Sequence, residues 1–139
     1  MGRILALDIG QKRIGLAVTD PSQIIATPLD TIHVSNIWEY LGKYIKENQV
    51  QMAVVGLPVQ SNGKPSDAMR YVKPFVKKFQ QTFPHIAINT YDERFTSVMA
   101  HAAIRESGAN RKVRQDKALA DKVSATLLLQ SYMLHRENS

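Results

Sequence analysis

The sequence contains no cysteine, one tryptophan and few aromatic residues, which make up 7% of its 139 positions. Without cysteine the chain has neither disulfide bonds nor a thiolate nucleophile, a composition compatible with a reducing cytosol. No apolar run approaches the roughly 20 residues that a helix needs to cross a bilayer, and the segment from Met1 to Ala6 is too short for a signal peptide. We therefore expect a cytoplasmic protein without a membrane partner.

Acidic residues are also scarce beside basic ones. Twelve Asp and Glu stand against eighteen Lys and Arg, which gives a net charge of +6 and a pI near 9.7. This balance favours a polyanionic partner, with nucleic acid as the first candidate. The chain length and the hydrophobic content of 44% are sufficient for one domain over residues 1–139 with a full core. We expect a monomer or a weak homodimer.

The first part of the chain predicts a β-hairpin. Two apolar runs, Ile4–Ile9 and Ile14–Val18, flank a turn at residues 10–12. Alternation along the first run gives one face Leu5, Leu7 and Ile9, and the other face Ile4, Ala6 and Asp8. A carboxylate at such a position is costly unless it is paired or binds a cation, so Asp8 is a candidate functional residue. The alternative is a surface-facing Asp on an edge strand.

Apolar periodicity predicts the remaining elements. They are a strand over Ile24–Ile32 broken by Pro28, a helix ending near Glu47, a strand over Met52–Leu57, one kinked helix through Pro74, a strand over Ile86–Tyr91, a helix that stops at Gly108 and a last helix from about Leu119 to His135. Asn36 and Glu39 have the spacing of a capping box at the start of the first helix.

Further carboxylates follow later in the chain. Asp92 and Glu93 end a predicted strand, and Asp121 lies near the start of the last helix. Asp121 shares one helix face with Ala125, Leu128, Leu129 and Tyr132. If these acids converge with Asp8, they supply the oxygen ligands that Mg²⁺ or Mn²⁺ requires, and such ions promote phosphodiester hydrolysis. If instead the last helix begins near Lys117, Asp121 is a first-turn acid favoured by the helix dipole.

At these residues the sequence resembles the YqgF (RuvX) family. The matching segments are Leu7-Asp8-Ile9-Gly10, Arg13-Ile14-Gly15-Leu16-Ala17-Val18, Val54-Val55-Gly56-Leu57-Pro58, Asp92-Glu93-Arg94-Phe95-Thr96-Ser97 and Asp121-Lys122-Val123-Ser124-Ala125. They occur in order over nearly the whole chain, which makes the match specific.

The resemblance implies an α/β fold of the RNase H-like superfamily, a five-stranded mixed sheet of order 3-2-1-4-5 with helices on both faces. It also implies a nuclease acting in 5′-end maturation of precursor 16S ribosomal RNA, and a relation to Holliday-junction resolvases. By motif, Asp8, Glu93 and Asp121 would be the catalytic and metal-binding acids. Asp92 is then an outer-shell group or a strand-end cap, and Arg94 contacts phosphate or pairs with an acid.

One departure leaves the number of metal ions, one or two, open. The superfamily often has a fourth acid near the third, whereas Lys122, Val123 and Ser124 follow Asp121 here. Other interpretations also stay open. A related hairpin opens the phosphate-binding lobe of sugar kinases and Hsp70-like ATPases, but those proteins need a second lobe that 139 residues cannot supply. The chain could also be a Holliday-junction-type DNA resolvase, or a non-catalytic nucleic-acid-binding module of the same fold.

Basic residues mark where a structured RNA or branched DNA would be held. Lys12 and Arg13 lie in the first hairpin, and Arg111, Lys112, Arg114 and Lys117 precede the last helix with Asp116 as the acid among them. We expect this second segment to be a loop that contacts the phosphate backbone. The alternative is a solvated surface without a partner.

The simultaneous change of Arg111, Lys112 and Arg114 to Gln tests this expectation. Removal of each phosphate contact lowers the slope of log affinity against log salt by roughly 0.7 to 0.9, so the slope should flatten by about two to three. The measurement is RNA or DNA binding at several salt concentrations. An unchanged slope would show that these charges belong to a solvated surface.

Overall fold

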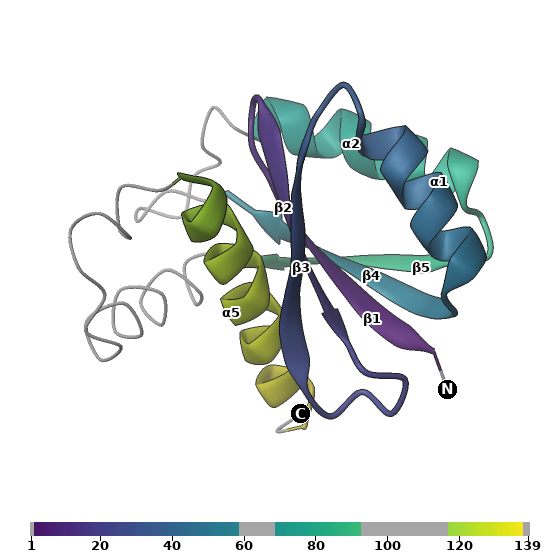
Figure 1. Cartoon of the computed structure of the whole chain (residues 1–139), viewed down its shortest axis with the longest axis vertical. Helices are drawn as coiled ribbons and strands as arrows, with labels where there is room; N and C mark the ends of the chain where they lie inside the picture. Colours follow the sequence, from purple (N-terminus) through teal and green to yellow (C-terminus); the bar gives the residue numbers. More distant parts are fainter. Residues whose placement is uncertain (1, 59–68, 93–116, 138–139) are drawn as a thin grey trace.

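Five strands form one mixed β-sheet at the centre of the molecule (Figure 1). The computed structural model describes residues 2–58, 69–92 and 117–137, with the backbone alone for 117–123 and 137. The strands are β1 (Arg3–Ile9), β2 (Arg13–Thr19), β3 (Ala26–His33), β4 (Val50–Leu57) and β5 (Ala87–Asp92). Their order is β3-β2-β1-β4-β5, with β1–β2 and β2–β3 antiparallel and β1–β4 and β4–β5 parallel. This confirms the sheet that the family resemblance implied.

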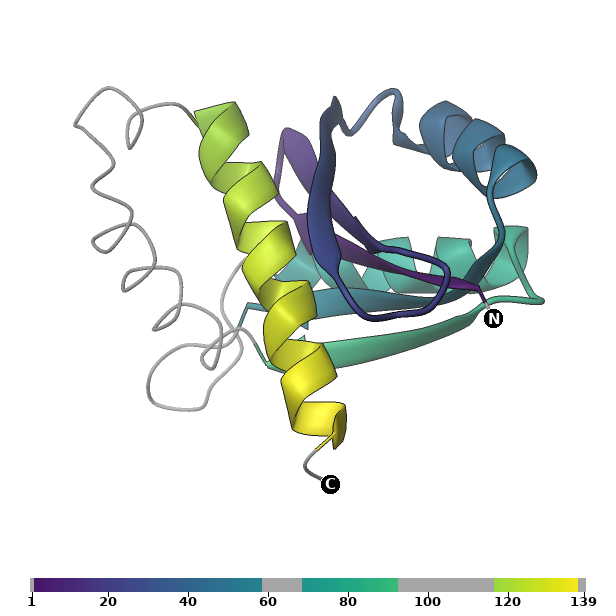
Figure 2. The ribbon, with the colours of Figure 1, turned by 60° about the horizontal axis from the view of Figure 1, so that its bottom comes forward.

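In the part of the chain that the structure describes, three helices cover the two faces of this sheet. Helices α1 (Ile37–Glu47) and α2 (Met69–Thr82) lie on one face, and α5 (Lys117–Glu137) crosses the other (Figures 1 and 2). Among the described residues, no helix is long and apolar enough to cross a membrane. The last helix begins two residues before its predicted start and ends two residues after its predicted end.

Strand β1 is buried on both of its faces, because it supplies each of two cores. Leu5, Leu7 and Ile9 pack in the core beneath α1 and α2. Ile4 and Ala6 pack in the core beneath α5. The predicted alternation along this strand is therefore confirmed, and its phase places every second residue of β1 toward α5.

The turn between β1 and β2 requires a glycine at its first position. The Gly10 N–H donates to the Arg13 carbonyl oxygen at 2.9 Å. A Cβ atom added at Gly10 would lie 2.7 Å from that same oxygen, closer than van der Waals contact allows. The predicted hairpin turn over residues 10–12 is thereby confirmed.

The prediction that Pro28 breaks the third strand was wrong. β3 is continuous from Ala26 to His33, and it lies at the edge of the sheet. Pro28 pairs with Ala17 while Asp30 pairs with Leu16, so a bulge at Leu29 takes up the irregularity. An edge strand tolerates a proline because it needs no second row of hydrogen bonds.

The predicted end of the first helix near Glu47 is confirmed, whereas the helix predicted to stop at Gly108 lies outside the described residues. Asn36 is the N-cap of α1 but its side chain makes no capping hydrogen bond, so the predicted capping box is absent. Its backbone, at φ −111° and ψ 0°, departs from the extended conformation that aims an N-cap side chain at the first turn. α2 runs through Pro74 as one helix, as predicted. Trp38 of α1 packs on the core, where its ring stacks on Phe75 with centroids 4.8 Å apart.

The loop between β2 and β3 is fastened at Gln23. This residue has a left-handed φ of 59°, unusual for a residue other than glycine. Its side chain donates to the Gly2 carbonyl oxygen at 2.7 Å and accepts from the Arg136 guanidinium at 2.9 Å. These bonds stabilise the strained backbone and tie the end of α5 to the start of β1.

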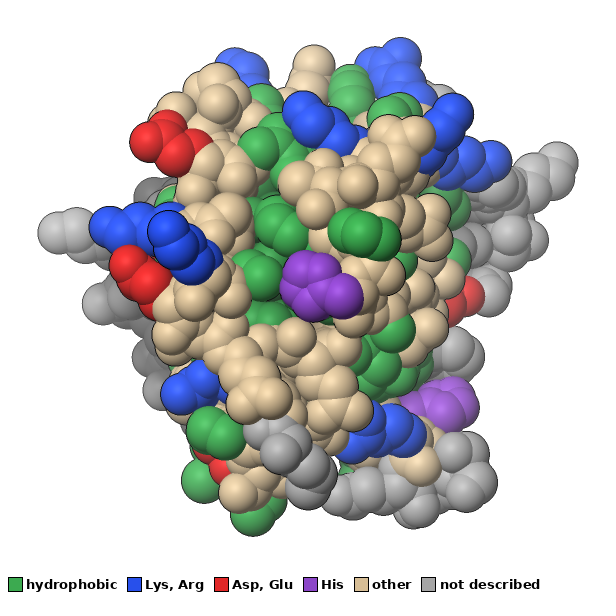
Figure 3. Space-filling view, turned by 90° about the vertical axis from the view of Figure 1, so that its right-hand side faces the viewer, with side chains coloured by type: hydrophobic (Ala, Val, Ile, Leu, Met, Phe, Trp, Pro, Cys, Tyr) green, Lys and Arg blue, Asp and Glu red, His purple; other side chains and the backbone are tan. Residues whose placement is uncertain are grey.

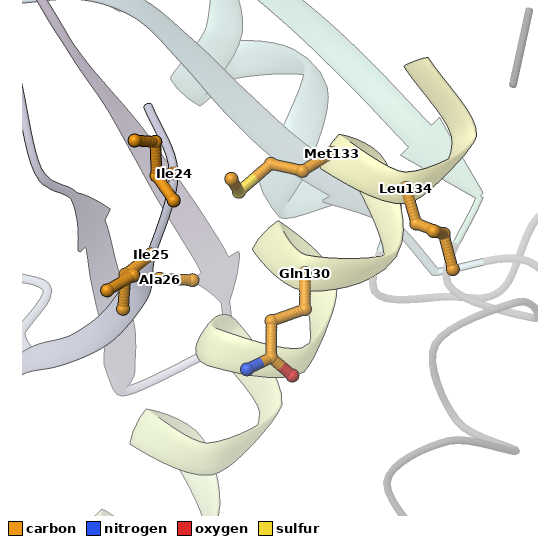
Figure 4. A pocket seen from close by; sticks show the side chains of 6 residues that line it. All are labelled: Ile24, Ile25, Ala26, Gln130, Met133 and Leu134. Carbon is orange, nitrogen blue, oxygen red and sulfur yellow. The ribbon is translucent and has the colours of Figure 1, made fainter. Parts of the chain in front are cut away.

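The same loop presents apolar side chains to solvent. Ile24 and Ile25 are 71% and 61% exposed, and Leu134 of α5 is 55% exposed. Together with Ala26, Gln130 and Met133 they line an open groove of about 320 Å³, into which Met133 points toward Ile24 (Figure 4). The third strand therefore begins later than predicted, because Ile24 and Ile25 belong to the loop.

Asp20 organises the start of this loop. Its carboxylate accepts the N–H groups of Ile24 and Ile25, both at 2.8 Å, and that of Ser22 at 3.2 Å. The Ile25 and Ile24 amides hold the pKa of the Asp20 carboxyl below its usual value of 3.8, because they stabilise the charged form. Asp20 is therefore a turn residue whose carboxylate fixes the backbone of the loop.

This arrangement predicts a pH-dependent contribution of Asp20 to stability. Because the folded pKa is depressed, the contribution is complete above the unfolded value of 3.8 and is lost as pH falls through the folded pKa. Asp20→Asn should therefore be less stable than the parent at neutral pH, and the difference should close in acid. Urea unfolding of both proteins across this range measures it. A difference that stays constant with pH would contradict the assignment.

Candidate active site

Three parallel strands end at the same edge of the sheet, and Asp8 lies there. Asp8 is the penultimate residue of β1. Leu7 pairs with Val55 of β4, and Leu57 at the end of β4 pairs with Asp92 at the end of β5. Open α/β sheets bind ligands at the carboxyl ends of their strands, so this edge is the expected position for a site.

Asp8 lies on the α5 face of the sheet. It follows Ile4 and Ala6 in the alternation of β1, and both of these pack beneath α5 with Ala125. Its side chain is half-buried, whereas the four residues before it are fully buried. Asp8 thus stands where the central strand leaves the core, and the alternative of an edge-strand aspartate is excluded because β1 is central.

Glycines flank Asp8 on the neighbouring strands. Gly15 of β2 is paired directly with Asp8, and Gly56 of β4 follows the residue that pairs with Leu7. Both are buried. Neither residue has a side chain, so at these two positions the neighbouring strands place only backbone beside Asp8. The two glycines were not among the predicted site residues, although a glycine inside a strand is a known sign of close approach by another group.

Asp92 lies on the opposite face from Asp8. Tyr91, its neighbour, faces α5, where its hydroxyl hydrogen-bonds the Ser131 Oγ at 2.8 Å. By alternation Asp92 faces α1 and α2, as does Leu57, with which it pairs. The structure therefore places Asp8 and Asp92 at one edge of the sheet but does not bring their side chains to one face.

Helix α5 carries Asp121 toward the Asp8 end of the sheet. The helix is fastened near Gly2 through Gln23 and Arg136, so its carboxyl end lies where β1 begins. Its 21 residues span about 31 Å back toward the end where β1 finishes. Asp121 is one turn before Ala125, which packs against the α5 face of the sheet as predicted.

The start of α5 also bears on the alternative for Asp121. The helix does begin at Lys117, which was the condition for a first-turn acid. Asp121, however, is the fifth residue of the helix, and the first turn contains no acidic residue. The helix dipole acts mainly within the first turn, so it gives Asp121 little stabilisation.

Two basic residues lie at this end of the sheet. Lys12 is exposed in the β1–β2 turn, where its carbonyl accepts the Val34 N–H at 2.9 Å. Arg13 begins β2 and is half-buried, and alternation places it on the same face as Gly15. Positive charge is therefore available on the Asp8 face.

The other predicted site residues are not placed. Glu93, Arg94, Arg111, Lys112 and Arg114 lie outside the described residues, and for Lys117 and Asp121 the backbone alone is described. Within residues 2–58, 69–92 and 117–137, no group of three or more metal-binding side chains comes together.

The fold and the position of Asp8 define the class of protein: an RNase H-like domain, with an acid at the end of its first strand and a helix packed over that face. The chain belongs to the RuvX family, described as Holliday junction resolvase, whose model matches residues 2–135.

Curated relatives cover nearly the whole chain. A protein of Parabacteroides distasonis is 47% identical over 133 residues, covering 96% of this chain and 95% of its own, and one of Porphyromonas gingivalis is 48% identical over 133 residues, covering 96% of each. Both carry the name "Putative pre-16S rRNA nuclease". These relationships make the chain a member of a family of nucleases, which are hydrolases.

Solved structures agree on the fold. The fowlpox virus resolvase in complex with Holliday junction DNA matches with a TM-score of 0.56 at 12% identity, over 96% of this chain and 98% of that chain. Thermus thermophilus RuvC, also bound to a Holliday junction, matches with a TM-score of 0.56 at 14% identity, over 97% and 96%. At this identity the likeness confirms the RNase H-like fold that the sequence resemblance implied.

Proposed function

We propose that this protein is a metal-dependent endonuclease that hydrolyses phosphodiester bonds in structured RNA, acting in 5′-end maturation of precursor 16S ribosomal RNA. The observation that carries the proposal is the half-buried Asp8 at the end of the central strand, flanked by Gly15 on the α5 face. The substrate in this proposal is taken from the names of two relatives, which are 47% and 48% identical to this chain. A cytoplasmic location belongs to the same proposal.

Asp8, Glu93 and Asp121 are the proposed metal ligands and catalytic acids, with Mg²⁺ or Mn²⁺ as the ion. Asp8 fits this role because a hard cation prefers carboxylate oxygens, and because its paired residue Gly15 has no side chain. The phase of β5 favours Glu93 over Asp92, since Asp92 faces α1 and α2. A bound ion supplies an activated water and stabilises the charge that develops on the phosphate oxygens.

The chain's own cations hold the substrate in this proposal. Lys12 and Arg13 lie at the Asp8 end of the sheet, where they neutralise the charge of the approaching phosphate backbone. Arg111, Lys112, Arg114 and Lys117 are proposed to extend this contact, and Arg94 to contact phosphate or an acid. Together they orient the scissile bond toward Asp8.

A DNA resolvase is the second candidate, favoured by the family description and by the fold shared with two junction resolvases. Cleavage of structured RNA and of a four-way DNA junction, measured side by side with Mg²⁺, separates the two candidates. Preferential cleavage of the junction would show that branched DNA, and not structured RNA, is the preferred substrate.

Asp8→Asn should remove nearly all Mg²⁺-dependent hydrolysis while leaving the fold intact. The substitution keeps the shape of the side chain and loses the charge that recruits the ion. A matched control is Asp30→Asn, which removes one carboxylate from edge strand β3 and should retain parent activity. Asp8→Asn activity within about threefold of the parent, where Asp30→Asn is unchanged, would end the catalytic assignment. A non-catalytic module would bind RNA without cleaving it.

Asp121→Asn tests whether the acids converge, without any substrate. Like charges held close together repel, so the variant should be more stable than the parent in chelator, by about 0.5–2 kcal/mol. Mg²⁺ or Mn²⁺ should raise the melting temperature of the parent by a few degrees, and this shift should largely vanish in the variant. Thermal melts at matched ionic strength measure both effects. Destabilisation in chelator, together with an equal response to metal, would show that Asp121 is not a ligand.

A further inference from the structure

Helix α2 carries an unusual concentration of positive charge on the face of the sheet opposite Asp8. Arg70, Lys73, Lys77 and Lys78 are all exposed, and the helix contains no acidic residue. In α1 beside it, two lysines are balanced by two glutamates. Lys and Arg side chains gather along the upper part of this side of the molecule (Figure 3). We call the four cations the α2 basic face.

Aromatic rings hold two of these cations in place. The Arg70 guanidinium lies 5.0 Å from the ring centroid of Tyr71 and donates to its hydroxyl at 2.8 Å. The Lys78 ammonium lies 4.7 Å from the ring centroid of Trp38. Side chains that are already ordered lose less conformational entropy when they bind an anion. Arg70 and Lys78, two of the four cations of the α2 basic face, are therefore ordered before an anion binds.

The spacing of the remaining cations fits a phosphate backbone. Lys73 and Lys77 are four residues apart on the outer face of α2, a distance of roughly 6 Å along the helix axis. One strand of a DNA duplex carries a phosphate about every 3.4 Å along its axis, and the spacing along an A-form RNA duplex is somewhat shorter. The two lysines therefore reach phosphates about two steps apart on one strand.

The α2 basic face begins at the same end of the sheet as Asp8. The chain leaves β4 at its carboxyl end, at Leu57, and α2 returns toward the start of β5, which pairs with the start of β4. Arg70, in the first turn of α2, thus lies near the carboxyl edge of the strands. Helix α2, which carries Lys73 and Lys77, runs along the face of the sheet opposite α5 (Figure 2).

We propose that the α2 basic face is a second phosphate-binding surface, which holds a segment of the RNA that flanks the segment at Asp8. The inference rests on the proposed function in that the same RNA passes the carboxyl edge of the sheet and continues along α2. Such a surface would select substrates long and structured enough to contact both faces.

Lys73→Gln/Lys77→Gln tests this proposal against the matched control Lys43→Gln/Lys46→Gln in α1. Both variants lose two charges from an exposed helix surface, and Gln is a good helix former. The probe is an RNA hairpin with a single-stranded extension, bound in chelator so that no cleavage occurs. The α2 variant should lower the slope of log affinity against log salt by about 1.4 to 1.8, and the α1 variant should leave it near that of the parent.

Three outcomes would overturn the proposal. The first is an unchanged slope in the α2 variant, and the second is an equal loss in both variants, which reports net charge alone. The third is that the α2 variant binds phosphatidylserine–phosphatidylcholine vesicles less well than the parent while its RNA slope is unchanged. That result would assign the surface to a membrane. Because binding in chelator requires no hydrolysis, full activity of Asp8→Asn would refute the catalytic site and leave this result standing.

Discussion

The central position of β1 is the constraint on which the rest of the structure depends. Residues Ile4 to Leu7 are fully buried, because each face of this strand packs against a different helical layer. A shift of one residue in its pairing would exchange the two faces and move Asp8 beneath α1 and α2. The register with β2 and β4 therefore fixes which side of the protein carries the site. The core contacts that stabilise the domain also orient the candidate catalytic carboxylate.

The two faces of the sheet differ in the size of the side chains that cover them. Large residues such as Leu41 of α1 and Phe79 of α2 fill one layer, whereas Ala125 of α5 packs with Ala6 and Ala17 of the sheet in the other. Small residues let a helix backbone approach the strands closely. The Tyr91–Ser131 hydrogen bond then fixes α5 to β5. This close approach is what makes a shared site between a strand end and a helix start feasible on this face and not on the other.

Local features could be predicted from the sequence, and features set by distant contacts could not. The face of Asp8 follows from a two-residue alternation within one strand, whereas the strand order came from the family resemblance. The continuity of β3 through Pro28 depends on a bulge opposite β2. The carboxyl end of α5 is tied down by the hydrogen bond between Arg136 and Gln23, which are 113 residues apart. The position of Gly15 beside Asp8 became visible only from the register of β1 and β2.

The irregular edge strand β3 has a consequence for behaviour at high protein concentration. It adjoins two exposed isoleucines, and a regular edge next to apolar side chains is a template for strand addition between molecules. Pro28 has no N–H to offer an incoming strand, and the bulge at Leu29 interrupts the outer row of hydrogen bonds. Pro28, the residue that departs most from an ideal strand, thus disfavours cross-β aggregation. Its replacement by a β-branched residue would make the edge regular and remove this protection.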